Sequence, residues 1–169
     1  RAWGKERPAS PQNPVILHPL RKAGRSAEKK IADVQKRLVS DGQAHAVLTL
    51  PDSICWLFNI RGSDIAHNPV VLAFAIVPAS GKPELFIDGA KLSKEVRRDL
   101  ETIATIAEPE DLKGRVAELK SAGKPVRLDP ETAAFALARG LGSKVISAGP
   151  DPCIALKAIK NAAEISGSR

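Results

Sequence analysis

The sequence predicts an α/β protein whose mixed β-sheet is flanked by helices. Beyond residue 90, short apolar runs alternate with segments of helical periodicity. Strands separated by helices are joined by crossovers into parallel pairs, and the helices cover the sheet on both faces. Before residue 90, two apolar runs at residues 70–77 and 84–87 are separated by a connection with two prolines and a glycine, which predicts an antiparallel hairpin. A sheet containing both kinds of strand pair is mixed.

The first helix is expected after a proline-rich entry segment. Residues 1–24 read as an extended connector, with an edge strand around residues 15–18. Ser26 is the expected N-cap of the helix, and Gly42 is its expected end. The apolar residues of this helix recur at helical spacing and are Ala27, Ile31, Val34 and Leu38.

A buried strand and a short apolar segment follow this helix. Residues 45–50 form a short apolar run between turn residues, which is typical of a buried strand. Residues 51–53 are expected to form a turn or the start of a helix. Residues 54–58 then continue as a short helix or as an irregular apolar segment.

The second half alternates helices with short strands. One helix is marked by Leu92, Val96 and Leu100, and the next runs from Pro109 to Gly123. A third is expected to have Asp129 as its N-cap and Pro130 as its first residue, and to end by Gly140. The expected strands lie at residues 103–107, 126–128 and 145–146.

The last part of the chain carries a helix-start signal. Residues 153–159 read as a helix. Asn161 and Glu164 have the spacing of a capping box, in which each side chain accepts a main-chain N–H of the other residue. Another helix is therefore expected to begin at Asn161.

The net charge of +7 is unevenly distributed. Residues 1–40 hold ten Lys or Arg and three Asp or Glu, whereas residues 41–169 hold sixteen of each. Nucleic-acid surfaces commonly interleave basic with aromatic residues, but the chain has two Trp, four Phe and no Tyr. The basic residues are therefore expected to form a solvated helix face, or a patch that meets an acidic surface, and no nucleic-acid partner is expected.

The apolar residues and cysteines favour a cytoplasmic protein. No apolar run approaches the roughly 18 residues of a membrane span, and the first residues lack the apolar core of a signal peptide. Cys55 and Cys153 lie far apart among apolar neighbours. Reduced, packed thiols in a cytoplasmic protein without a membrane partner are the expected result.

The sequence offers no catalytic or metal-binding motif. Its three histidines, at positions 18, 45 and 67, have no carboxylate cluster at ligand spacing. It contains no Gly-x-Ser-x-Gly motif and no glycine-rich phosphate loop after a strand. We therefore predict no catalytic residue, no metal ligand and no cofactor site within this chain.

The candidate functional residues lie in the segment ICWLFNIRGSDIAHN, residues 54–68. Arg61 and Asp64 are close enough across Gly62 for a turn to join them in an ion pair. Gly62 permits a positive φ or the close approach of another backbone. The candidate cluster consists of Trp56, Asn59, Arg61, Asp64, His67 and Asn68. It is either a structural network that holds the loop in place or a gate that lines a site completed by another domain or subunit.

The same segment resembles a known family. WLFNIRGSD at residues 56–64, followed by HNPV at residues 67–70, resembles the middle domain of three-domain Xaa-Pro aminopeptidases in the creatinase/prolidase superfamily. Four further segments resemble that family: Trp3 with Arg7 and Pro8, residues 24–30, residues 85–88, and residues 157–161 with Glu164. The match at residues 157–164 resembles the segment that enters the family's catalytic domain.

The resemblance implies a ribonuclease-H-like α/β fold and a division of the chain. Residues 1–24 would be a linker from a preceding domain, residues 25–152 the creatinase N-terminal-like domain, and residues 153–169 an exit segment into a catalytic domain. The parent enzyme would release the N-terminal residue that precedes proline, using two divalent metal ions, usually manganese. Their carboxylate and histidine ligands would follow the exit segment, so this chain alone is expected to be inactive.

The resemblance also implies partners and alternatives. The expected partners are the chain's own catalytic domain, a peptide with proline second and, because the family often dimerises, a second copy. The expected roles are scaffolding, substrate gating or oligomerisation. One alternative is a histone-chaperone-like pseudo-peptidase domain that binds proteins, supported only by the basic first forty residues. Another is a prolidase or creatinase of the same superfamily.

Overall fold

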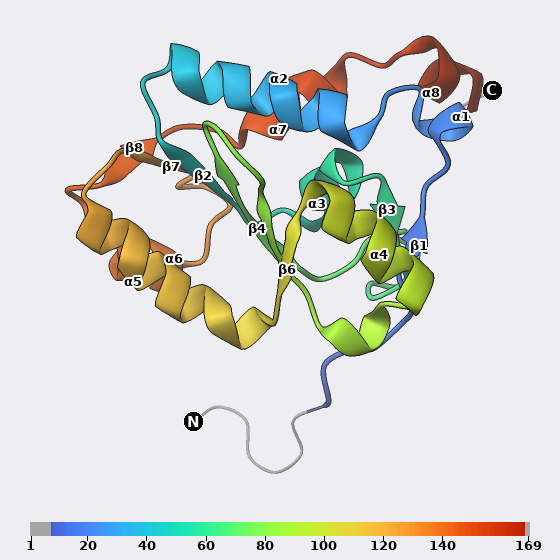
Figure 1. The fold of residues 1–169 in the computed structure, drawn as a ribbon, viewed down its shortest axis with the longest axis horizontal. Helices are drawn as coiled ribbons and strands as arrows, with labels where there is room; N and C mark the ends of the chain where they lie inside the picture. The colour runs from blue at the N-terminus through green and yellow to red at the C-terminus, as the bar shows by residue number, and fades with distance from the viewer. Residues whose placement is uncertain (1–7, 168–169) are drawn as a thin grey trace.

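A computed structural model describes residues 8–167 and shows a six-stranded mixed sheet with helices on both faces (Figure 1). The strand order is β6-β5-β4-β2-β7-β8. Only β4 runs antiparallel to its neighbours in this sheet. The strands are β2 (His45–Leu48), β4 (Phe74–Pro78), β5 (Glu84–Phe86), β6 (Thr105–Ala107), β7 (Val126–Leu128) and β8 (Ile146–Ala148). The predicted fold class and the β4–β5 hairpin are confirmed.

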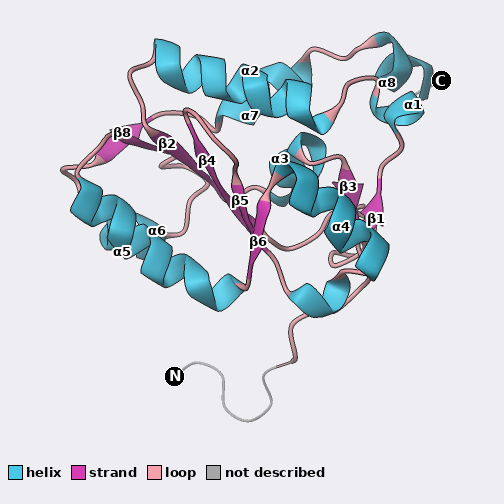
Figure 2. Cartoon of the chain, in the orientation of Figure 1, coloured by secondary structure: helices cyan, strands magenta, loops and turns pink. Residues whose placement is uncertain are grey.

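Two core clusters lie on the two faces of the sheet. Figure 2 shows the helices that cover these faces. One face packs against α2 (Ala27–Ser40), α3 (Pro51–Leu57), α4 (Lys94–Ile103) and α7 (Pro152–Ala158). The other face packs against α5 (Leu112–Ala122) and α6 (Phe135–Leu141). Side chains alternate along a strand, so Ala46 and Leu48 enter the first cluster and Val47 enters the second.

The first helix forms as the sequence predicts. The Ser26 hydroxyl accepts the Lys29 N–H at 3.4 Å and caps α2. All four predicted apolar residues of α2 are buried. Gly42 follows the helix with a φ of 67°, a conformation that glycine adopts without steric cost.

A smaller sheet joins the entry segment to the candidate loop. Strand β1 (Ile16–Leu17) pairs antiparallel with β3 (Ile60–Arg61), so the predicted edge strand is confirmed. The remaining short elements are α1 (Leu20–Ala23), α8 (Ala162–Gly167) and two 3-10 turns, η1 (Gly89–Lys91) and η2 (Pro109–Asp111). Figure 1 shows α1 and α8 side by side near the C-terminal end. Trp3 and Arg7 of the family resemblance lie outside the described residues.

Several predicted element boundaries are wrong. Leu92 precedes α4, Ile103 ends α4 and is not part of β6, and Pro109 opens η2 and not α5.

The third helix of the second half starts at Phe135, and Asp129 does not cap it. Instead, the Asp129 carboxylate accepts the Glu131 N–H at 3.0 Å and the Asp151 N–H at 3.1 Å. An Asp side chain that binds nearby main-chain N–H groups stabilises a turn in place of a helix.

The strand predicted at residues 70–77 begins only at Phe74. The residues before Phe74 bind the candidate loop: Val70 O accepts the Asp64 N–H at 3.1 Å, and Leu72 N–H donates to the Asp64 carboxylate at 2.8 Å. The apolar run is therefore divided between the loop and the sheet.

Candidate functional site

The candidate loop is anchored beneath α3 by a buried lysine. Asn59, which follows α3, has a φ of 52°, and its side-chain oxygen accepts a hydrogen bond from Lys30 Nζ at 2.8 Å. Lys30 Nζ also donates to Trp56 O at 2.9 Å and lies 4.5 Å from the centroid of the Trp56 ring. Lys30 is 1% exposed, and burial lowers its pKa to about 8. Trp56 and Asn59 therefore belong to one network that fixes the start of the loop.

The predicted ion pair between Arg61 and Asp64 is wrong. Asp64 pairs with Lys91, whose Nζ lies 2.7 Å from the Asp64 carboxylate, and the two side chains are only 1% and 4% exposed. Arg61 instead donates through one guanidinium nitrogen, Nη1, to Cys55 O at 3.2 Å and to Ile60 O at 2.8 Å. Sequence proximity was misleading because Lys91 comes from η1, a distant part of the chain that packs on the loop.

The remaining loop positions form a tight connection. Gly62 has an ordinary φ, so the positive φ is not observed. A Cβ placed there would lie 3.3 Å from Val70 O and 2.6 Å from the Val71 side chain, so another backbone does approach closely, but the tightest contact is with a side chain. His67 and Asn68 are exposed in a turn closed by the Asn68 N–H and Ile65 O at 3.1 Å. His67 has a φ of 61°, which suits the third position of a type II turn.

Three of the six candidate residues line one groove. Trp56, Arg61 and Asn68 border a groove of about 830 Å³, whose other walls come from α1, α7 and α8. Asn59, Asp64 and His67 are not among the residues that line it. Asn59 and Asp64 instead support the loop through Lys30 and Lys91. The structure thus divides the predicted cluster into groove residues and supporting residues.

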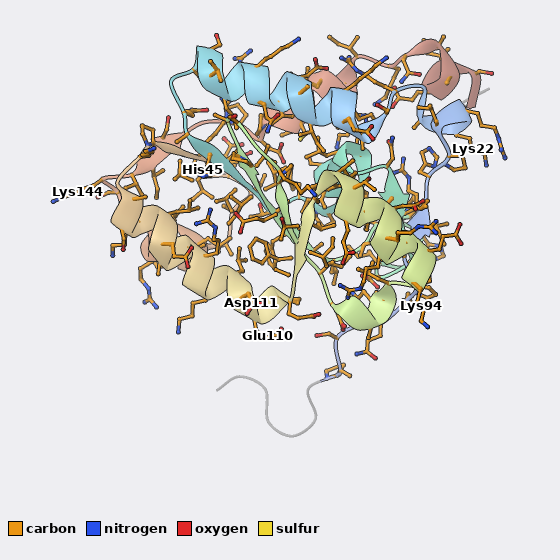
Figure 3. All side chains as sticks on the ribbon, viewed as in Figure 1. Lys22, His45, Lys94, Glu110, Asp111 and Lys144 are labelled. Carbon is orange, nitrogen blue, oxygen red and sulfur yellow. The ribbon has the colours of Figure 1, made fainter. Side chains whose placement is uncertain are left out.

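The groove carries an excess of positive charge. Its ionised side chains are Arg21, Lys22, Asp52, Arg61, Lys157, Lys160 and Glu164. Burial lowers the pKa of His18, and the nearby charges of Arg61, Lys30 and Lys22 lower it further. Figure 3 shows Lys22 on α1, on the side of the molecule where α8 lies. Burial is the larger cause of the lowered His18 pKa, and the surrounding cations add to it.

The α8 wall of the groove is held by the predicted capping box. Asn161 Oδ1 accepts the Ala163 and Glu164 N–H groups, and the Glu164 carboxylate accepts the Asn161 N–H at 2.9 Å. Asn161 Nδ2 also donates to Ala23 O at 2.8 Å, which ties α8 to α1. The capping box is confirmed, and it also joins two elements distant in sequence.

The chemistry of the described residues is limited. Residues 8–167 contain no group of three or more His, Cys, Asp or Glu that could hold a metal ion, so they do not fit a dinuclear metal centre. Cys55 and Cys153 are free and buried, and burial raises both thiol pKa values. Buried thiols with raised pKa values are poor nucleophiles. Among residues 8–167, no helix is long and apolar enough to span a membrane.

The predicted cluster did not include the supporting residues Lys30 and Lys91. It also lacked His18 and the groove cations Arg21, Lys22, Lys157 and Lys160. Lys30 could have been found, because it lies between Ala27 and Val34 at the helical spacing that defines the buried face of α2. Lys91 and His18 carry no local signal, because each meets the loop only through tertiary packing.

Comparisons of the sequence with known proteins identify its family. The family model described as "Creatinase/Prolidase N-terminal domain" matches residues 6–164. The chain is 39% identical over 180 aligned positions to a probable Xaa-Pro aminopeptidase P of Ajellomyces capsulatus, covering 99% of this chain and 29% of that protein. It is 38% identical to a protein of the same name from Arthroderma benhamiae, covering 25% of it. The chain thus spans under a third of the length of these relatives.

A solved structure matches over the same extent. The X-prolyl aminopeptidase of Caenorhabditis elegans, described as a cytosolic enzyme with a di-nuclear active site, matches with a TM-score of 0.90 and 27% identity. The match covers 98% of this chain and 28% of that enzyme. The N-terminal domain of the peptidase PepQ from Mycobacterium tuberculosis has a TM-score of 0.57 at 8% identity, which shows a shared fold alone. The chain therefore belongs to the creatinase/prolidase N-terminal domain family.

Proposed function

We propose that the chain is the non-catalytic middle domain of a metal-dependent Xaa-Pro aminopeptidase. Similarity to Xaa-Pro aminopeptidases over 99% of the chain is the observation that carries the proposal. The chain spans only 29% of that relative, which leaves room in such a protein for a separate catalytic domain. The parent enzyme would release the residue that precedes proline at the N-terminus of a peptide.

The proposed role of this domain is to support the catalytic domain and to border the route by which a peptide reaches it. The groove beside Arg61 supports this role, because its lining combines the buried Trp56 side chain with charged side chains that are not buried. Two divalent metal ions, proposed to be manganese, would be held by the catalytic domain, since residues 8–167 provide no ligand group for them. We further propose a cytoplasmic location and the catalytic domain, or a second copy, as partners.

An activity assay tests the proposal. The purified 169-residue chain and the longer protein encoded by the same gene would each be incubated with manganese and a peptide carrying proline second. Mass spectrometry would follow release of the first residue, and elemental analysis would count bound manganese. We expect turnover and about two ions for the longer protein, and neither for the chain alone.

Two outcomes would overturn the proposal. Metal-dependent turnover by the 169-residue chain would show that it is catalytic. A longer protein that lacks turnover but binds histones in a salt-sensitive way would favour the protein-binding alternative. Cleavage restricted to dipeptides would instead indicate a prolidase.

A further inference from the structure

Arg61 is a fixed cation without a carboxylate partner among the described residues. Its Nη1 donates to Cys55 O and Ile60 O, and these two bonds hold the guanidinium at the wall of the groove. Asp64, the nearest acid in sequence, is committed to Lys91. A guanidinium anchored through one nitrogen keeps its remaining N–H donors for another acceptor, and carboxylates match that geometry.

The surrounding charges favour an anion at the same place. Burial is the main cause of the lowered pKa values of His18 and Lys30. Arg61 lowers both further, whereas Glu164 acts on both in the opposite direction, so these charges share one region in which the cations outnumber the acids. The acids of the groove are engaged: Asp52 pairs with Lys157, and the Glu164 carboxylate accepts the Asn161 N–H. The groove therefore has a net positive charge that its own acids do not neutralise.

The shape and floor of the groove favour a peptide over a small inorganic anion. A volume of about 830 Å³ exceeds what phosphate needs and falls within the range of sites for larger ligands. Trp56 and Val70, 9% and 3% exposed, contribute apolar surface beside Arg61. An apolar surface next to a fixed guanidinium matches the last residues of a peptide, whose side chains lie beside a terminal carboxylate.

We propose that Arg61, supported by Lys22 and Lys160, binds the C-terminal carboxylate of a peptide in this groove. The choice of a peptide rests on the proposed function, but the site itself rests on the geometry around Arg61. Such a site would hold the trailing end of a short peptide while its N-terminal end is processed elsewhere. It would favour peptides with a free carboxylate over amidated ones.

Calorimetric titration of the 169-residue chain tests the site without any catalysis. The probes are the peptide Ala-Pro-Ala-Ala-Ala as the free acid, the same peptide as its C-terminal amide, and inorganic phosphate. We expect the acid to bind about tenfold or more tightly than the amide at low salt. Arg61→Gln should reduce acid binding to the level of the amide and leave amide binding unchanged.

Matched variants keep the test informative. Arg98→Gln serves as the control, because Arg98 is a surface arginine that pairs with Asp99 away from the groove. Arg61→Gln also removes two bonds to main-chain carbonyls, so its fold is checked by circular dichroism. If it fails to fold, Lys22→Gln and Lys160→Gln, both at exposed positions, should each weaken acid binding severalfold.

Defined outcomes would overturn the proposal. Equal binding of acid and amide would exclude recognition of the terminal carboxylate. Phosphate binding as tight as acid binding would indicate a general anion site. Tight binding of an amidated peptide with an internal Glu would assign the groove to acidic segments. Because none of these readouts needs turnover, they are independent of whether the longer protein is an aminopeptidase.

Discussion

At the scale of single residues, the buried pair of Asp64 and Lys91 decides how the candidate loop is held. The Asp64 carboxylate receives both Lys91 Nζ and the Leu72 N–H, while its second oxygen is buried without a hydrogen-bond partner. A buried charge is tolerated only while its counter-ion is present. The loop therefore depends on Lys91 for its stability, and Asp64 does not pair with Arg61.

Removing Lys91 should destabilise the chain far more than removing Arg61. Lys91→Met leaves the Asp64 carboxylate buried without its counter-ion, which costs about 3–5 kcal/mol. Arg61→Met leaves two carbonyls without a donor and should cost about 1–2 kcal/mol. Urea unfolding measures both. Lys94→Met, at an exposed position, is the matched control and should change little.

A double variant strengthens this test. Asp64→Leu combined with Lys91→Met removes both charges, so much of the lost stability should return. Equal losses for Lys91→Met and Arg61→Met would contradict the assignment of Lys91 as the partner of Asp64.

Lys30 should make stability depend on alkaline pH. Its pKa is lowered to about 8 in the folded chain from a reference value of 10.5. Between these values the unfolded chain holds the proton and the folded chain does not, so the free energy of unfolding rises with pH. Deprotonation of Lys30 contributes at most about 3 kcal/mol to the free energy of unfolding over this pH range. Below pH 8 the folded chain bears the full cost of burying the charged amine.

The measurement compares the chain with Lys30→Met by urea unfolding at pH 7.5, 9 and 10.5. The buried thiols have raised pKa values and act in the opposite direction, but both proteins contain them, so their effect cancels in the difference. We expect the chain to gain stability relative to Lys30→Met as pH rises. A difference that does not change with pH would refute the role of Lys30.

At the scale of elements, α8 depends on contacts made by its first residues. A helix of six residues is too short to be stable alone, so capping and packing must hold it. Asn161 supplies both by capping α8 and by donating to Ala23 O at the end of α1. Gly24 allows this approach, because a Cβ there would lie 2.6 Å from Asn161 Cγ.

Asn161→Ala should release α8 from α1. The variant loses the cap and the bond to Ala23, which together are worth about 1–2 kcal/mol. Hydrogen exchange should become faster across Ala162–Gly167, while α4 should be unaffected. Ser93→Ala, which removes the cap of α4 instead, is the control and should show the reverse pattern. Unchanged exchange in α8 would show that other contacts hold it.

At the scale of the whole molecule, segments from both ends of the described chain enter the core. Val15 and Ala23 are 3% and 2% exposed, and Cys153 is fully buried. The Val15 N–H donates to Lys91 O at 2.9 Å, which links the entry segment to the support of the candidate loop. The predicted division at residues 24 and 152 stays a prediction. Because residues outside these limits pack in the core, truncating the chain at these positions tests it directly.

Truncation to residues 25–152 should destabilise the fold. Loss of Val15, Ala23 and Cys153 from the core removes buried apolar area and leaves cavities, at a cost on the order of 3–5 kcal/mol. Thermal unfolding of residues 25–152, 25–169 and 1–152 locates the loss at one end or both. A fragment 25–152 as stable as the 169-residue chain would support the predicted division.

Much of the fold could be predicted because it depends on local pattern. The buried face of α2, the β4–β5 hairpin and the capping box at Asn161 follow from residues within a few positions of one another. The helix expected at Asp129 failed because its carboxylate binds Asp151 as well as Glu131, and the first of these contacts is not local. The candidate site was predicted only in part, because some of its contacts are likewise not local.

The sequence alone determined the fold class, the family resemblance and the segment that carries the candidate residues, because hydrophobic periodicity and turn chemistry are written in neighbouring positions. Only the tertiary structure decided the partners. Lys91 lies in sequence far from Asp64 and close to it in space, and the same holds for Lys30 and Asn59. Which of several cations pairs with one buried carboxylate depends on packing and desolvation, which act through space. Because Lys91 is the partner of Asp64, Arg61 lies at the wall of the groove.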